Sequence, residues 1–133
     1  MCVNSILTKG YAQQYGVVYQ ETFAHVARYD TIKLILAFVS HSSWQIHQRD
    51  VKSAFLNGLL AEEIYIEQPD GFSTPRKEDQ VYLLTKTSYG LKQAPRAWYE
   101  RMYNHLIQLG FSRSQSEATL YVKVNAAGES LIV

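Results

Sequence analysis

The segment QRDVKSAFLNG, residues 48–58, holds the side chains whose types and spacing could do chemistry. It contains one carboxylate, Asp50, and one bulky aromatic ring, Phe55, five residues later. Because side chains alternate across a strand, a strand over residues 44–50 would carry on one face Trp44, Ile46, Gln48 and Asp50. That face begins apolar and ends acidic, which is how a core strand delivers a carboxylate to a cleft at its tip. A carboxylate at a strand end is more often simply hydrated, so these residues alone leave both interpretations open.

Two helices are predicted from the apolar patterns. A stripe at i, i+3, i+4 and i+7 over residues 32–40 predicts a well-buried helix, capped by Asp30 or Thr31. Pro95 suits the first turn of a second helix that ends at Leu109, just before a glycine. The buried face of this second helix would consist of Trp98, Met102, Leu106 and Leu109.

Strands and turns are predicted from alternation and from turn residues. The predicted strands cover residues 5–9, 44–50, 63–67, 80–85 and 119–124, with a further strand beginning at 131. The predicted turns and loops lie at residues 57–58, 69–71, 89–95 and 125–128. No linker or repeat divides the chain, so a single domain is expected.

Composition limits the class of protein. The chain has 133 residues, of which 47% are hydrophobic, as in a globular domain. Its 13 basic and 12 acidic residues give a net charge of +1, so nucleic-acid binding would need a local basic patch. Cys2 is the only cysteine, which excludes an intramolecular disulfide and a cysteine-rich zinc site. The longest apolar run, residues 34–39, is far too short to cross a membrane, and we expect an intracellular protein.

Three long motifs carry a family resemblance. They are DVKSAFLNG (residues 50–58), EIYIEQPDGF (residues 63–72) and YGLKQAPRAWY (residues 89–99). Shorter supporting motifs are KGY (residues 9–11), ETFA (residues 21–24) and ATLYV (residues 118–122). Together they resemble the reverse transcriptase of copia-type LTR retrotransposons, in the family's order and over nearly the whole chain.

The resemblance implies an α+β fold, the partial fingers and palm of a reverse transcriptase, with an antiparallel palm sheet backed by helices. Residues 1–133 would form one partial reverse transcriptase domain that ends before the Asp-Asp catalytic hairpin. The implied activity is RNA-directed DNA polymerisation: addition of dNTPs to a primer on an RNA or DNA template, with Mg²⁺ as cofactor.

The resemblance also implies roles for individual residues around the incoming nucleotide. Asp50 would be the first catalytic and metal-binding carboxylate. Phe55 would be an aromatic gate that crowds a ribose 2′-hydroxyl, and its alternative is a simple core residue. Tyr89 and Gly90 would lie beside the incoming base and sugar. Lys9 would meet the triphosphate, although a lone surface lysine is the alternative.

Three further residues match the family's template region: Lys92, Gln93 and Arg96. Cations there would contact phosphates, whereas without the family they would be ordinary surface charges.

Two features separate this chain from an intact polymerase. The family's other two carboxylates come from an Asp-Asp pair in a hairpin turn after the strand that begins at Leu131, and the 133 residues contain no such pair. We therefore expect the chain to be inactive alone. Residues at four positions also depart from the family's pattern, as drift in a relic would produce: Val3, Ser5, Arg49 and Ser88. The alternatives are a non-enzymatic nucleic-acid-binding fragment, using Lys92, Arg96 and the tyrosines, or a functionless relic of a retrotransposon.

Overall fold

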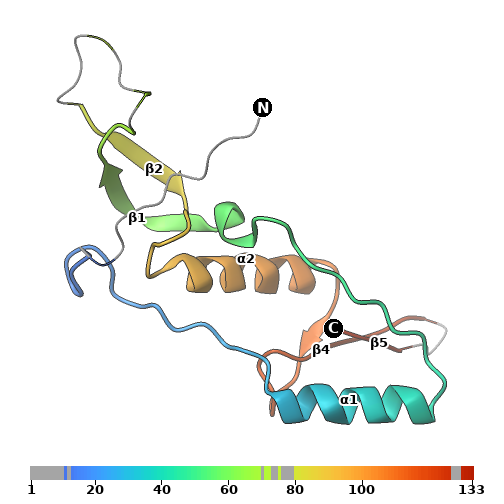
Figure 1. Cartoon of the computed structure of the whole chain (residues 1–133). Coiled ribbons are helices and arrows are strands. Elements are labelled where there is room, and N and C mark those ends of the chain that lie inside the picture. The colour runs from blue at the N-terminus through green and yellow to red at the C-terminus, as the bar shows by residue number, and fades with distance from the viewer. Residues whose placement is uncertain (1–10, 12, 70, 73–74, 76–79, 127–129) are drawn as a thin grey trace. The chain divides into compact units, whose positions relative to one another are not determined.

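A computed structural model describes residues 11, 13–69, 71–72, 75, 80–126 and 130–133. The chain divides into two compact units, Met1–Ala24 with Ser53–Met102 and His25–Lys52 with Tyr103–Val133. Within the described residues the elements are α1 (Tyr29–His41), the 3-10 helix η2 (Ala54–Asn57), β1 (Leu59–Ile66), β2 (Tyr82–Lys86), α2 (Ala94–Gln108), β3 (Ser112–Arg113), β4 (Tyr121–Val124) and β5 (Ser130–Ile132) (Figure 1).

The strands form two antiparallel sheets, β1 with β2 and β3 with β4 and β5. The predicted α+β class is confirmed at this level, with two separate sheets where one was expected. In the described part of the chain, no helix is both long and apolar enough to cross a lipid bilayer.

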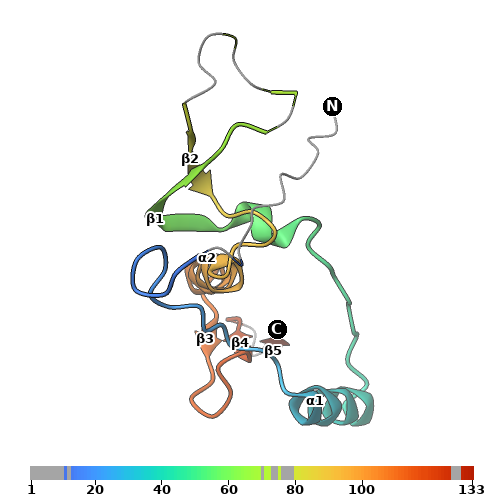
Figure 2. The same ribbon diagram turned by 60° about the vertical axis from the view of Figure 1, so that its left-hand side comes forward.

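In the first unit, the β1–β2 sheet packs on the start of α2. Ile64 is buried on β1, opposite Leu84 of β2, as the alternation of the EIYIE segment predicts. Ile64 forms a core with Leu91 and Ala94, where α2 begins, and Phe55 packs against this core. Figure 2, which looks nearly along α2, shows β1 lying across the helix. The β1–β2 sheet therefore holds in place both the start of α2 and the segment that carries Phe55.

The predicted second helix is confirmed, although it ends at Gln108, one residue earlier than predicted. Pro95 lies in its first turn. Gly110, at φ +84°, ends it: the Gly110 N–H donates to Ile107 O at 2.9 Å, and the Phe111 N–H donates to Leu106 O at 3.0 Å. This is the paired bonding of a glycine-terminated helix, which a left-handed residue makes possible.

The predicted apolar stripe of α2 is only partly buried. Leu106 is buried, and Trp98 and Met102 are half-buried. Leu109 is 48% exposed, so its predicted burial is wrong. It lies one residue beyond the helix, in the turn that leads into Gly110, and no longer follows the helical period.

In the second unit, the first predicted helix is confirmed but its cap and burial are not. The helix begins at Tyr29, so Asp30 lies in its first turn, and Arg28 occupies the capping position without a side-chain hydrogen bond. Val39 is buried, whereas Leu34 is 71% exposed. The expectation of a well-buried helix is therefore wrong.

The predicted strand over residues 44–50 is wrong. None of the described residues pairs with this segment in a sheet, and a strand needs a neighbour for its backbone N–H and C=O groups. Trp44 instead packs edge-on against Phe38 of α1, with 5.5 Å between ring centroids. Ile46 is 58% exposed, so the proposed apolar face does not meet a core.

The two strands predicted near the end of the chain pair antiparallel, as expected, whereas the turn predicted over residues 125–128 lies partly outside the described residues. Val122 of β4 lies opposite Ile132 of β5, and the backbones of Tyr121 and Val133 exchange hydrogen bonds of 2.8 and 2.9 Å. Tyr121 is buried and its ring lies 6.3 Å from that of Tyr103. The strand predicted over residues 5–9 lies outside the described residues.

Glu117 connects the segment before β4 to the start of α1. Its carboxylate accepts hydrogen bonds from the Thr119 hydroxyl at 2.8 Å, the Thr119 N–H at 3.3 Å and the Thr31 hydroxyl at 3.2 Å. The Arg28 guanidinium lies 3.9 Å away. The Thr119 hydroxyl bond, and then the Thr119 N–H bond, lower the pKa of Glu117 below its ordinary value of 4.5, against the opposing effect of partial burial.

Replacing Glu117 by Gln should flatten the response of stability to acid. Because folding lowers this pKa, the carboxylate's contribution is complete above the unfolded value and is lost as pH falls through the folded value. The wild-type urea midpoint should therefore fall more steeply than that of Glu117→Gln between about pH 5 and about pH 3. Glu67→Gln, at an exposed carboxylate, is the matched control and should follow the wild type. Parallel curves for wild type and Glu117→Gln would contradict the role of this cluster.

Candidate functional site

A tight turn over residues 53–58, hereafter the Phe55 turn, carries the candidate aromatic gate. Ser53 adopts a left-handed conformation at φ +54°, and its carbonyl accepts from the Leu56 N–H at 3.0 Å. The Asn57 side chain also donates to that carbonyl, at 3.2 Å. The segment thus forms the 3-10 helix η2 where the sequence predicted only a turn at Asn57 and Gly58.

Two side chains from other segments hold the Phe55 turn. The Thr87 hydroxyl donates to the carbonyl of Phe55, and the Thr87 N–H donates to Gly58 O at 3.0 Å. Thr87 is only 2% exposed, so water cannot replace these bonds. The Arg101 guanidinium, from α2, donates to Asn57 O at 2.8 Å. Neither residue could be identified from the sequence, since both lie outside the three long motifs.

Gly58 allows the Phe55 turn to lie directly against α2. A Cβ atom at this position would lie 2.6 Å from Thr87 Oγ1, 3.0 Å from Ala97 Cβ and 3.1 Å from the Trp98 backbone nitrogen. No heavier side chain fits there without movement of the turn or the helix. The glycine is thus required by close approach and not by its backbone angles, which are ordinary.

The structure brings together three of the residues predicted to meet the nucleotide. The rings of Phe55 and Tyr89 lie edge to face, with centroids 5.4 Å apart and planes at 63°. Gly90 follows at φ +96°, a conformation that glycine adopts without strain. Phe55 also packs on the core, so both interpretations of this residue are compatible with its position. Lys9, the fourth, lies outside the described residues.

Lys92 is exposed but already engaged. Its ammonium donates to Gln13 O at 3.1 Å and to the Tyr19 hydroxyl at 3.2 Å, and it lies 4.9 Å from the centre of the Tyr19 ring. Its backbone N–H donates to the Gln13 side-chain oxygen at 2.9 Å. A template phosphate would therefore have to compete with Tyr19 and Gln13 for this cation.

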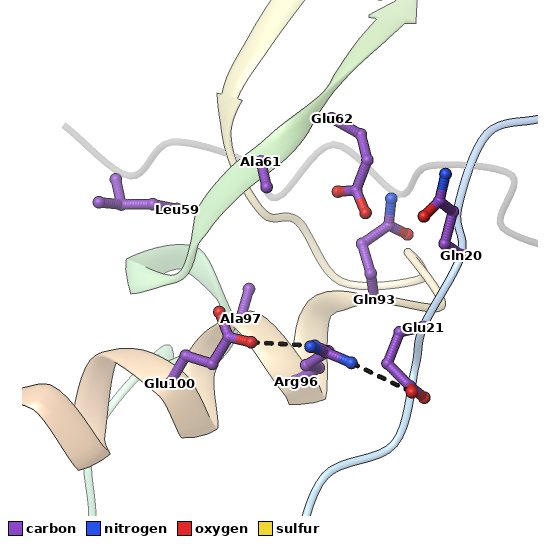
Figure 3. Close-up of a pocket in the computed structure, with 9 residues that line it drawn as sticks. All are labelled: Gln20, Glu21, Leu59, Ala61, Glu62, Gln93, Arg96, Ala97 and Glu100. Atoms are coloured by element: carbon purple, nitrogen blue, oxygen red, sulfur yellow. Dashed lines mark hydrogen bonds and ion pairs between the residues drawn. The ribbon is translucent and has the colours of Figure 1, made fainter.

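Arg96 is paired with two carboxylates. It lies 2.9 Å from Glu100, one turn along α2, and 3.3 Å from Glu21 (Figure 3). These residues line one hollow with Glu62 and Gln93. The positive charge predicted to contact the template is thus balanced locally, and the hollow is acidic overall.

Gln93 is buried at 3% exposure, which was not expected of a template contact. Its side-chain oxygen accepts from the Gln13 amide at 3.0 Å, and its Nε2 has no hydrogen-bond partner among the described residues. The Lys92 N–H fixes which end of the Gln13 amide is the donor, and this in turn fixes the orientation of Gln93. In Figure 3 the Gln93 amide lies between Glu62 and Gln20.

Asp50 is exposed, outside any helix or strand, and belongs to the second unit, whereas Phe55 and Tyr89 belong to the first. Among the described residues, no group of three or more His, Cys, Asp or Glu side chains could hold a metal ion. The described residues therefore do not by themselves fit a Mg²⁺ ion, which needs several converging oxygen ligands.

A family model described as reverse transcriptase (RNA-dependent DNA polymerase) matches residues 3–133. The chain belongs to this family. The resemblance to copia-type elements is confirmed by relatives that are similar over most of this reverse transcriptase segment. No solved structure matches it.

The curated relatives are much longer Pol polyproteins. The segment is 44% identical to the retrovirus-related Pol polyprotein from transposon RE2 and 43% to that from transposon RE1, both of Arabidopsis thaliana, over 117 residues. It is 38% identical over 118 residues to the polyprotein from transposon TNT 1-94 of Nicotiana tabacum. These alignments cover 88–89% of this reverse transcriptase segment but only 8–9% of the relatives.

Substituting Gly58 by Ala tests the contact of the Phe55 turn with α2. If position 58 had room for a methyl group, Gly58→Ala would stabilise the chain by about 0.4–1 kcal/mol, because alanine reduces the conformational freedom of the unfolded chain. With the contacts described above, we expect it to destabilise the chain by about 1–3 kcal/mol, the usual cost of overpacking. Urea denaturation gives the sign directly, and a stabilised variant would contradict the close approach.

Releasing Arg96 from its carboxylates should strengthen nucleic-acid binding. The double variant Glu21→Gln/Glu100→Gln should bind a labelled single-stranded oligonucleotide more tightly than wild type, with a salt slope steeper by roughly 0.7 for one new phosphate contact. Fluorescence anisotropy at several salt concentrations measures both quantities.

Two controls separate a freed arginine from a change in net charge. Glu63→Gln/Glu67→Gln alters the net charge by the same amount at exposed positions away from Arg96. It should increase the affinity for the oligonucleotide less than Glu21→Gln/Glu100→Gln does. Adding Arg96→Gln to the double variant should remove the gain. Equal gains in both double variants would show that Arg96 itself does not contact the strand.

Proposed function

We propose that this chain is the fingers and palm portion of a retrotransposon reverse transcriptase domain, and that it shapes the site where a dNTP joins a primer on an RNA or DNA template. The contact between Phe55 and Tyr89 supports this most directly. These residues come from two motifs separated by 34 positions in the sequence, and the fold places their rings in contact.

In this proposal the two rings and the adjacent glycine form a wall beside the nucleotide. Phe55 is anchored by its backbone and by the core, so its ring cannot easily retreat from an added 2′-hydroxyl. Tyr89 supports that ring from the side. Gly90, without a side chain, leaves room for the base and sugar to approach the backbone. Lys9 contributes a positive charge to the triphosphate.

The template side of the proposal rests on Lys92, Gln93 and Arg96. Lys92 is the exposed member and meets a phosphate by exchanging its present partners. Arg96 does so by giving up one of its two carboxylates. Gln93, being buried, orients Gln13 and the loop that carries Lys92.

Asp50 is proposed as one oxygen ligand of catalytic Mg²⁺, because Mg²⁺ prefers hard carboxylate ligands. The remaining ligands would have to come from the longer polyprotein, since the described residues do not complete an ion site. We accordingly propose that the 133 residues are inactive alone and active only as part of a larger polymerase.

The same contacts count against a non-enzymatic nucleic-acid-binding fragment. Such a fragment would hold phosphates with Lys92 and Arg96, but both side chains are already bound to neighbouring groups. A functionless relic would not need the two separated motifs to meet, although a young relic would retain this contact.

The decisive experiment is a hybrid polymerase in which residues 3–133 replace the aligned segment of one of the plant relatives. We expect the hybrid to extend a primer on an RNA template. In the hybrid, Phe55→Val should raise the use of ribonucleotides relative to dNTPs by at least about tenfold, which corresponds to about 1.4 kcal/mol of lost discrimination. Single-nucleotide extension with each substrate measures the ratio.

Three controls accompany this measurement. The unmodified relative shows that the assay works, Asp50→Asn in the hybrid should abolish extension, and the 133 residues alone should show none. A hybrid that folds but never extends a primer would favour the relic. An unchanged ratio of ribonucleotide to dNTP use in Phe55→Val would contradict the proposed role of Phe55 as a gate.

A further inference from the structure

We propose that Thr87 is a positioning residue that sets the distance between Phe55 and Tyr89, and thereby the discrimination between deoxy- and ribonucleotides. This inference rests on the proposed function. It concerns a residue outside the motif positions to which roles were assigned, on the segment between β2 and the loop that carries Tyr89.

Thr87 contacts the Phe55 turn through both its side chain and its backbone. Its hydroxyl donates to the Phe55 carbonyl and lies 3.5 Å from Gly58 O, which also accepts from the Thr87 N–H at 3.0 Å. A hydroxyl has one proton, so its bond to the Phe55 carbonyl is the one that holds the gate residue itself.

Among the described residues, the hydroxyl is the one donor to that carbonyl that comes from outside the Phe55 turn. The other donor to Phe55 O is the Gly58 N–H, at 3.3 Å and within the same tight turn. Without the hydroxyl, Thr87 would hold the turn only through its N–H bond to Gly58 O, three residues after the gate. The Phe55 backbone would then lose its direct bond to Thr87, while the end of the turn stayed in place.

The same residue also fixes the position of Tyr89. Thr87 is buried at 2% exposure, the following Ser88 is buried, and Tyr89 comes next. Only two buried residues, Thr87 and Ser88, therefore lie between the hydrogen bond that holds Phe55 and the residue that carries the Tyr89 ring. Because one residue anchors one ring through its side chain and leads to the other through its backbone, the spacing of the rings depends on Thr87.

A specific consequence follows for selectivity. A steric gate discriminates only if its ring cannot move away from a 2′-hydroxyl, and a shift on the order of 1 Å is enough to impair a positioned group. Loss of the Thr87 hydroxyl should therefore relax discrimination even though Phe55 and Tyr89 are unchanged.

The first test uses the 133-residue chain and NMR spectroscopy. Thr87→Val keeps the shape of the side chain but removes the donor, and Thr87→Ser keeps the donor. We expect the cross-relaxation between the Phe55 and Tyr89 rings to weaken in Thr87→Val and to persist in Thr87→Ser. Thr85→Val, at an exposed position of β2, is the matched control. Should Thr87→Val not fold, Thr87→Ala gives the same comparison, and failure of both to fold would overturn a positioning role in favour of a purely structural one.

The second test uses the hybrid polymerase. We expect Thr87→Val to raise the ratio of ribonucleotide to dNTP use several-fold, and Thr87→Ser to restore it. A merely structural role would lower kcat/KM for both substrates equally and leave the ratio unchanged, which would overturn the inference. If Phe55→Val changes the ratio and Thr87→Val does not, only this inference fails. If neither does, the proposed gate itself fails.

Discussion

The close approach of Gly58 to the start of α2 is the constraint on which the first unit depends. It places the Phe55 turn within reach of Thr87 and Arg101, which bind the carbonyls of Phe55 and Asn57. The same approach leads directly into β1, whose Ile64 meets Leu91 and Ala94 in the core. Any side chain at position 58 would push the turn from the helix and loosen all these contacts together. Because Gly58 has no Cβ atom, the packing of the sheet and the position of the candidate gate residue Phe55 depend on the same close approach.

Charge in this unit is balanced by short-range pairing and not by a basic surface. Arg96 lies between Glu21 and Glu100, and Lys92 is held by Tyr19 and Gln13. The ion pairs of Arg96 are partly exposed, and pairs of this kind contribute little to stability, whereas the partners of Lys92 are neutral groups. This local pairing agrees with the net charge of +1. Counting the cations in the YGLKQAPRAWY motif therefore overstates the unpaired positive charge that it presents.

The sequence predicted those elements whose cause is local. The alternation that places Ile64 in the core, Pro95 in the first turn of α2 and Gly110 after its end all act over a few residues. The strand predicted over residues 44–50 is wrong, because a strand depends on a partner that its own alternation does not specify. The same holds for the candidate site. Phe55 and Tyr89 could be identified from their motifs, whereas the hydrogen bond from Thr87 to Phe55 joins residues 32 positions apart and leaves no periodic pattern in the sequence.

The two chemical roles implied by the family therefore have different physical supports in this chain. The Phe55 turn is preorganised: its backbone is bonded at Phe55, Asn57 and Gly58, and the Phe55 ring packs on the core. Asp50 is exposed and lies outside regular structure, and an isolated exposed carboxylate retains a full hydration shell that a metal ion must displace. Shape selection needs only rigid apolar surface, which a short segment can supply from its own contacts. Ion binding needs several carboxylates held together against their mutual repulsion, and the described residues bring no such group together.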